Sequence, residues 1–188
     1  VIFSEEFTLQ PKAPAEPTAG MLAGRLLALM EEHQLSRERV IGLGIAVRGI
    51  CSADGRTVCD SFGALAEENF PLCQRFEELT GFPAVMSNNV RALFAAQMYL
   101  SRDRAEGAQF FLRCEYGIGA SLSVDGQIWS GVTEQCAEIG HIPVIPRGGK
   151  PCSCGKSGCL ETIASPSAMR EDALAQGEPI EALQATSA

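Results

Sequence analysis

The sequence has few aromatic residues, few histidines and no long apolar run. Only 6% of its 188 residues are aromatic, and it contains two histidines and one tryptophan. No apolar stretch approaches the roughly 20 residues that a membrane-spanning helix needs, and no signal-peptide pattern opens the chain. These absences predict a cytoplasmic protein without a membrane partner.

Basic residues are also in deficit. Fifteen Lys and Arg stand against 23 Asp and Glu, which gives a net charge of −8. An acidic surface repels phosphate backbones, so we do not expect this chain to bind nucleic acid by itself. An apolar content of 46% with 20% charged residues excludes general disorder and suffices for one domain or two small lobes.

Cysteine, in contrast, is abundant, with eight residues. An even number can indicate disulfides, but nothing here indicates secretion, and a chain of this length does not need such cross-links. Five cysteines are scattered, mostly among apolar neighbours, and we expect them to be small buried core residues. They are Cys51, Cys59, Cys73, Cys114 and Cys136.

The other three cysteines share one glycine-rich loop and cannot all be core residues. Cys152, Cys154 and Cys159 follow His141 in the pattern His-x10-Cys-x-Cys-x4-Cys. Three thiolates and one imidazole form a closed tetrahedral set, which is the usual environment of a structural zinc ion. The alternative is a reduced, reactive thiol loop in which Cys152 and Cys154 form a redox pair.

Two glutamates flank this set. Glu138 precedes His141 by three residues, and Glu161 follows Cys159 by two. If one metal binds His141 and Cys159, both carboxylates are drawn into the same neighbourhood. Two carboxylates beside an imidazole can accept hydrogen bonds from several vicinal hydroxyls, which is what a sugar presents. The alternative for each glutamate is a surface charge without a ligand.

The hydrophobic pattern alternates between strand and helix periods, which predicts an α/β fold with mixed sheets. The apolar run 40–47 suits a strand covered on both faces. The other expected strands are 1–9, 83–86, 109–114, and a hairpin of 120–124 and 127–129 across Asp125-Gly126.

Helices are expected over residues 19–34 and 70–80. A third helix begins after Ser87 or Asn88, either of which is a suitable N-cap. Asn89 then lies at a strand-to-helix junction, where ligands often meet an α/β sheet. Ser165-Pro166 begins a short fourth helix.

The motif Glu138-x-Gly-His141, followed by Cys152-x-Cys154-Gly-x-x-Gly-Cys159-x-Glu161, closely resembles that of the ROK family (repressors, open reading frames, kinases). Other segments fall in the family's order, and the resemblance covers residues 40–165. These segments are Gly44 to Gly49, Ser87 to Ala92, and the glycine loop Gly117-Ile118-Gly119-Ala120.

The resemblance implies an actin- and hexokinase-like (ribonuclease H-like) fold, with two α/β lobes and the sugar in the cleft. Residues 1–100 would be the N-terminal lobe, without its first phosphate-loop strands. Residues 101–188 would begin the C-terminal lobe, with the hairpin, the glycine loop and the zinc motif. The chain therefore looks truncated at both ends relative to the family.

The resemblance also implies roles for individual residues. Zinc would be held by His141, Cys152, Cys154 and Cys159. Sugar hydroxyls would be contacted by Asn88, Glu138, His141 and Glu161. Gly117 and Gly119 would be the remnant of a phosphate loop. Members of the family are either sugar kinases or sugar-responsive repressors with an added N-terminal DNA-binding domain.

Departures from the family pattern favour the regulator branch. The kinase base is an aspartate, but Asn89 stands here, and a neutral amide cannot take up a proton near pH 7. Glu115-Tyr116 replaces the glycine-threonine that opens the second phosphate loop, and a carboxylate there repels a triphosphate. Arg48 replaces the proline of an earlier loop, and the first phosphate loop is absent.

The leading hypothesis is therefore a sugar-sensing, zinc-stabilised effector domain of a ROK-type transcriptional regulator, without kinase turnover. We expect a small sugar or amino sugar as ligand, a homo-oligomer, and contact with DNA only through a domain outside this chain. The second hypothesis is a fragment of an ATP-dependent sugar kinase of the glucose or N-acetylhexosamine type, with ATP and Mg²⁺ as further cofactors. The third is a degenerate protein that keeps zinc for folding and interaction only.

Overall fold

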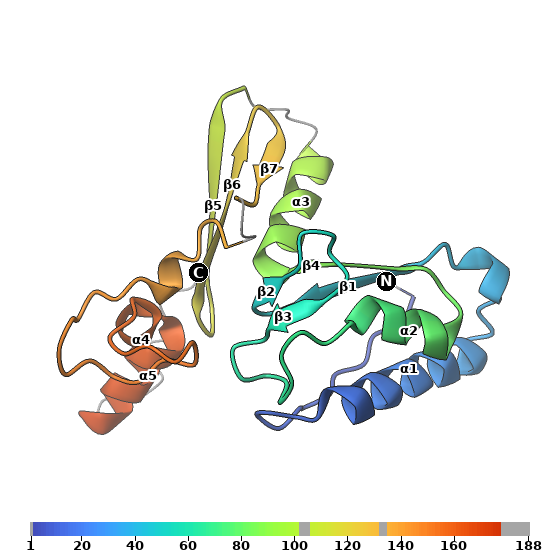
Figure 1. The fold of residues 1–188 in the computed structure, drawn as a ribbon, viewed down its shortest axis with the longest axis horizontal. Helices are drawn as coiled ribbons and strands as arrows, with labels where there is room; N and C mark the ends of the chain where they lie inside the picture. Colours follow the sequence, from blue (N-terminus) through green and yellow to red (C-terminus); the bar gives the residue numbers. More distant parts are fainter. Residues whose placement is uncertain (1, 102–105, 132–134, 178–188) are drawn as a thin grey trace. The chain divides into compact units, whose positions relative to one another are not determined.

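The computed structural model describes residues 2–101, 106–131 and 135–177. The chain divides into two compact units, Val1–Ala92 and Leu93–Ala188 (Figure 1). The division falls inside helix α3 (Asn89–Ser101). The lobe boundary near residue 100, which rests on the family resemblance, stays a prediction.

The first unit packs two helices against short strands. Helices α1 (Ala15–Glu32) and α2 (Leu72–Thr80) lie side by side in Figure 1. A parallel pair is formed by β1 (Leu43–Val47) and β4 (Ala84–Asn88), and an antiparallel pair by β2 (Ile50–Cys51) and β3 (Val58–Asp60). A short 3-10 helix, η1 (Arg37–Arg39), precedes β1. The core between these elements includes Val58 and Cys73, both fully buried.

The junction between β4 and α3 has the N-cap that the sequence predicts. The side-chain oxygen of Asn88 accepts hydrogen bonds from the backbone N–H groups of Val90 (2.9 Å) and Arg91 (3.2 Å). Its amide nitrogen donates to the backbone oxygen of Gly49 at 2.9 Å. Because these bonds satisfy donors of the first helical turn, the cap fixes Asn89 as the first residue of α3.

The second unit contains an antiparallel sheet of β5 (Ala108–Cys114), β6 (Ile118–Val124) and β7 (Gln127–Trp129). Asp125 and Gly126, which join β6 to β7, both have positive φ, as a two-residue hairpin turn requires. Phe94 of α3 stacks on Phe111, with ring centroids 5.3 Å apart. Further along the chain lie η2 (Ile139–His141), α4 (Glu161–Ala164) and α5 (Pro166–Ala175), the last capped as predicted by Ser165.

Two predictions at the start of the chain were wrong. Residues 2–9 form no strand, and residue 1 lies outside the described residues. Helix α1 begins at Ala15 instead of residue 19. Pro17 does not delay the helix, because a proline in the first turn lacks only an N–H that has no partner within the helix.

Strand β1 is also less covered than predicted. It begins at Leu43, and its burial alternates along the strand, with Gly44 and Ala46 exposed within the described chain. Leu43, Ile45 and Val47 point into the core cluster. Only one face of this strand is therefore packed, whereas the apolar run predicted that both faces would be covered.

The scattered cysteines differ in burial. Cys51 and Cys73 are buried, as predicted, and Cys59 and Cys136 are partly buried. Cys114 is exposed, so its prediction as a core residue was wrong. It ends β5 on the face of the strand whose other side chains are also exposed, since burial alternates along this strand.

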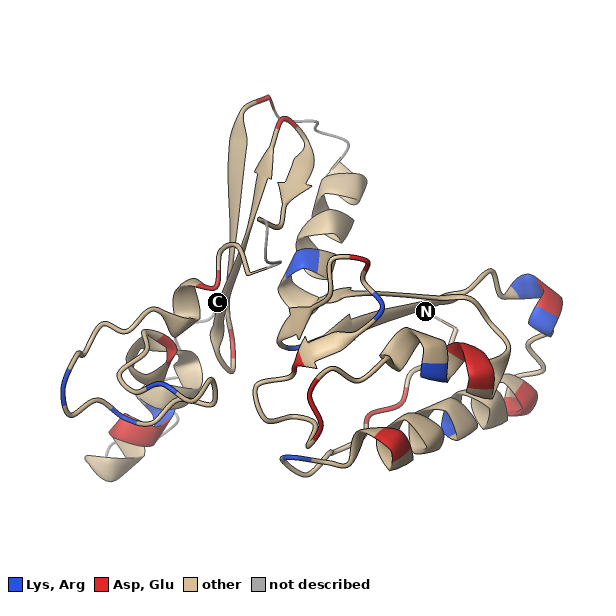
Figure 2. Cartoon of the chain, in the orientation of Figure 1, with Lys and Arg blue, Asp and Glu red and all other residues tan. Residues whose placement is uncertain are grey.

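Acidic and basic residues are interspersed along α1 and α2 (Figure 2). Arg25 pairs with Glu32 at 2.7 Å on α1, and Arg75 with Glu78 at 3.0 Å on α2. Such exposed pairs contribute little to stability, and neither helix presents a basic face. No helix in the described part of the chain is long and apolar enough to cross a membrane.

Candidate metal centre

His141 is positioned by a tight turn that packs against β6. Its backbone N–H donates to the backbone oxygen of Glu138 at 3.1 Å, and Ala137, just before, has a φ of 67°. A side chain at Gly140 would place its Cβ 2.0 Å from the backbone oxygen of Ile118. The glycine of the Glu-x-Gly-His motif is therefore required by the close approach of the turn to β6.

The cysteine loop folds back on itself through backbone hydrogen bonds. Cys152 N–H donates to the oxygen of Lys156 at 2.8 Å, and Gly158 N–H to that of Lys150 at 2.9 Å. Gly158 has a φ of 71°, and a Cβ there would lie 2.0 Å from the oxygen of Ile145. Glycine is therefore required at this position of the loop.

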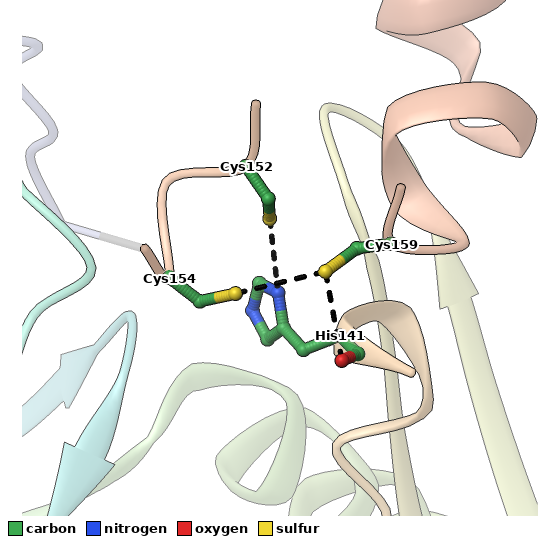
Figure 3. Close-up of side chains that lie close together, drawn as sticks. All are labelled: His141, Cys152, Cys154 and Cys159. Carbon is green, nitrogen blue, oxygen red and sulfur yellow. Dashed lines mark hydrogen bonds between the residues drawn. The ribbon is translucent and has the colours of Figure 1, made fainter. Parts of the chain in front are cut away.

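The fold brings the three thiols and the imidazole together (Figure 3). The Sγ of Cys152 lies 3.4 Å from Nδ1 of His141, and the Sγ atoms of Cys154 and Cys159 are 3.7 Å apart. All four potential ligand atoms lie within 4.8 Å of one another. His141 and Cys159 are buried, whereas Cys152 and Cys154 are partly exposed.

Two of these distances are compatible with a tetrahedral zinc ion. Zinc–sulfur bonds of about 2.3 Å at tetrahedral angles separate two sulfurs by about 3.8 Å, and a sulfur from a nitrogen by about 3.6 Å. The observed separations of 3.7 and 3.4 Å are close to both values. The cluster could therefore hold a metal through His141, Cys152, Cys154 and Cys159.

The surroundings shift the thiol pKa values in different directions. Burial raises the pKa of Cys152 to about 12, and burial also raises the pKa of Cys159. Burial alone would raise the pKa of Cys154, but the Lys156 backbone N–H and the neighbouring thiols lower it by more. Without a cation, two of the three thiols thus favour the protonated form, and a bound metal would supply the missing positive charge.

Glu161 touches this cluster directly. One of its carboxylate oxygens, Oε1, lies 3.1 Å from the Sγ of Cys152 and 3.4 Å from Nδ1 of His141. Its side chain is 18% exposed. Of the residues predicted to bind sugar, His141 and Glu161 are therefore adjacent, and Glu138 lies in the same turn as His141.

Asn88 and Asn89 belong to the first unit, at the carboxyl end of β4. Among the described contacts, the Asn88 side chain uses its oxygen and one amide hydrogen within the fold. Gly117 immediately precedes β6, and Gly119 lies within it, opposite Arg113.

The sequence did not indicate how close the glycine loop lies to Glu161. A Cβ built on Gly117 would lie 2.8 Å from Oε2 of Glu161. Ser167, to which the sequence assigned no role, donates a hydrogen bond to the backbone oxygen of Tyr116. These contacts join segments more than 40 residues apart, and no local sequence pattern reports such a pairing.

Comparison with known sequences gives one family. The sequence profile of the ROK family matches residues 3–187. A glucokinase from Halalkalibacterium halodurans is 32% identical over 144 residues, which are 77% of this chain and 43% of that protein. The N-acetylglucosamine repressor of Escherichia coli O6:H1 is 25% identical over 173 residues, which are 92% of this chain and 42% of that protein.

Comparison with solved structures gives the same result. A crystal structure of a ROK family transcriptional regulator, a homologue of the E. coli Mlc protein, matches 89% of this chain and 43% of its own with a TM-score of 0.72 and 25% identity. The predicted actin- and hexokinase-like α/β fold is confirmed. This chain spans less than half the length of these three relatives, and they include both regulators and a kinase.

Proposed function

The chain belongs to the ROK family, and we propose that it is the sugar-sensing part of a ROK-type transcriptional regulator that binds a sugar without phosphorylating it. Its ligand would be a hexose or an N-acetylhexosamine, because relatives are a glucokinase and an N-acetylglucosamine repressor. In a regulator, binding would favour one conformation of the domain and thereby alter an attached DNA-binding domain.

The observation that carries this proposal is the amide at Asn89. This residue begins α3 at the carboxyl end of β4, and its side-chain oxygen lies 3.0 Å from the N–H of Val90. In the kinases of the family, the corresponding aspartate takes the proton from the attacking sugar hydroxyl. An amide offers no site with a suitable pKa for that proton, so the sugar would bind without being activated.

Zinc would be structural in this account. Four protein ligands close the coordination shell, so no open position remains for a reacting water or substrate. Zinc would fix the loop that precedes Glu161 and the turn that carries Glu138. The two carboxylates would then accept hydrogen bonds from sugar hydroxyls, and the ring nitrogen of His141 that does not bind zinc would donate one.

A second candidate is a fragment of a sugar kinase, which the 32% identity to a glucokinase favours. The two candidates differ in whether the protein phosphorylates the sugar that it binds. Calorimetric titration of the full protein that carries this chain with D-glucose, N-acetylglucosamine and N-acetylmannosamine, followed by an ATP-dependent phosphorylation assay on the sugar that binds, separates them. Binding without phosphate transfer supports the regulator, and transfer to the sugar supports the kinase.

The third candidate, a protein that keeps the metal for folding only, predicts no sugar binding. Its test is the double substitution of Glu138 and Glu161 by glutamine in a protein that retains its metal. If the titration with sugars is identical before and after the double substitution, this candidate replaces the proposal.

A further inference from the structure

The loop between β5 and β6 lies directly against the proposed sugar-binding carboxylate. Gly117 is so close to Glu161 that any side chain there would meet Oε2 at 2.8 Å. Tyr116 directly precedes Gly117 in the chain. It is therefore next to the residue that approaches Glu161, whose carboxylate we propose to bind sugar hydroxyls. It stands where the family resemblance places a phosphate-loop residue of the kinases.

The backbone of this loop is held in place by several contacts. The Glu115 N–H donates to the oxygen of Gly117 at 3.1 Å, and the Glu115 carboxylate pairs with Arg113 at 2.5 Å. Ser167 donates to the backbone oxygen of Tyr116, and its hydroxyl lies 3.0 Å from that of Ser165, the cap of α5. The loop is thus anchored to the segment that directly follows Glu161.

The side chain of Tyr116, in contrast, is 84% exposed. An aromatic side chain on an anchored backbone has only two rotatable bonds, so it loses little entropy when it packs on a ligand. A pyranose presents hydroxyls at its edge and C–H groups on its faces. Carboxylates recognise the hydroxyls, and an aromatic ring, with its negative face, suits the C–H groups.

We propose that Tyr116 packs its ring on the apolar face of the sugar that Glu161 holds, and that it thereby determines affinity and selectivity for the ligand. The inference rests on the proposed function, because it needs a sugar at Glu161. It adds a recognition residue at a loop position where family kinases bind phosphate. It also gives a function to Tyr116, whose difference from the family's phosphate loop would otherwise only weaken nucleotide binding.

The chain offers a matched control. It contains two tyrosines, and Tyr99 on α3 is 85% exposed, almost the same as Tyr116. We would compare Tyr116→Ala, Tyr116→Phe and Tyr99→Ala with the unmodified protein by calorimetry with D-glucose, N-acetylglucosamine and N-acetylmannosamine. Tyr116→Ala should weaken binding about tenfold, whereas Tyr116→Phe and Tyr99→Ala should leave it unchanged.

Fluorotyrosine NMR gives a second measurement, in which Tyr116 itself is unchanged. With both tyrosines labelled by fluorine, each gives one resonance, and Tyr99→Phe assigns them. Saturation with the sugar that binds should shift the Tyr116 resonance and leave that of Tyr99 in place.

The outcomes separate this inference from the proposed function. If a sugar binds but the Tyr116 resonance stays in place, or if Tyr116→Ala and Tyr99→Ala bind equally well, the inference is overturned and the proposed function stands. Equal weakening by Tyr116→Phe and Tyr116→Ala would also overturn it, since the ring would then not be the recognised group. If the unmodified protein binds none of the three sugars, both fail.

Discussion

The carboxylate of Glu161 lies 3.1 Å from the sulfur of Cys152, so a predicted sugar-binding side chain contacts a predicted zinc ligand. The same carboxylate oxygen is 3.4 Å from Nδ1 of His141. A metal bound by Cys152 and His141 would change both contacts of Glu161, because the thiol would lose its proton and the ring nitrogen would be occupied. Metal binding and ligand binding should be coupled in this protein, because both depend on the same few side chains.

Substitution Cys154→Ser should remove the metal and strongly destabilise the protein. We expect about one zinc ion per chain in the unmodified protein by elemental analysis. The variant should contain almost none and should lose more than about 4 kcal/mol of unfolding free energy, because structural zinc contributes directly to folding. Cys114→Ser, at an exposed cysteine outside the cluster, is the control and should keep its zinc. Unmodified protein without metal, with the loop thiols in disulfides, would contradict the prediction.

Substitution Glu161→Gln should weaken sugar binding but keep the metal. A charge-assisted hydrogen bond contributes about 1.5–3 kcal/mol, so the dissociation constant should rise at least about tenfold in calorimetry. Zinc content should not change, because Glu161 is not one of the four clustered ligands. Glu171→Gln, at an exposed glutamate on α5, should bind sugar normally. Equal affinities of the two variants would refute the role of Glu161.

Chelation of the metal should also weaken sugar binding. The loop that ends at Cys159 leads directly into Glu161, so loss of the metal should release both from their positions. Titration before chelation, after chelation, and after zinc is restored should show high, low and again high affinity. Unchanged affinity in the chelated protein, with folding intact by circular dichroism, would mean that metal and ligand sites are independent.

Substitution Gly140→Ala should destabilise the second unit. Its methyl group would lie 2.0 Å from the Ile118 oxygen, so the turn must move away from β6. We expect a loss of about 1–3 kcal/mol in urea unfolding and weaker metal binding. Gly24→Ala, inside α1 with open space around it, should be neutral or slightly stabilising. If both variants unfold at the same urea concentration, the close approach at Gly140 has no energetic role.

Glu77 should make a pH-dependent contribution to stability. The Ala84 backbone N–H and the Arg56 guanidinium lower the pKa of its carboxyl below the usual 4.5. Because the folded protein favours the charged form, this stabilisation is complete above the unfolded pKa. It is lost as the pH falls through the folded pKa.

The test is urea unfolding of the unmodified protein and of Glu77→Gln as a function of pH. The variant should be less stable at neutral pH, and the difference should shrink as the pH falls below 4.5. Glu38→Gln, at an exposed glutamate of η1, is the control substitution. A difference that grows as the pH falls would contradict the assignment.

Features with a local cause could be predicted from the sequence. Asp125-Gly126 makes its hairpin turn, and Asn88 and Ser165 cap their helices, because each residue acts on its immediate neighbours. The clustering of His141 with three cysteines was also predictable, since three cysteines in one loop and a nearby histidine have little freedom to separate.

Features that depend on distant segments could not be predicted. The contact of Gly117 with Glu161 joins two loops that lie far apart in the sequence. The exposure of Cys114 depends on which face of β5 is covered, and an apolar residue by itself does not specify that. Segment 2–9 has a loosely alternating pattern but no described strand partner, and alternation without pairing does not form a sheet.

The most direct test of the central claim is to measure sugar binding and phosphate transfer on one sample of the full protein that carries Asn89. Calorimetry would identify the sugar among D-glucose, N-acetylglucosamine and N-acetylmannosamine. The same sample would then be incubated with that sugar, ATP and Mg²⁺, and the sugar phosphate quantified. We predict saturable binding, with a dissociation constant in the micromolar to millimolar range, and no sugar phosphate above the level without protein. Sugar phosphate that accumulates in proportion to protein concentration would contradict the account.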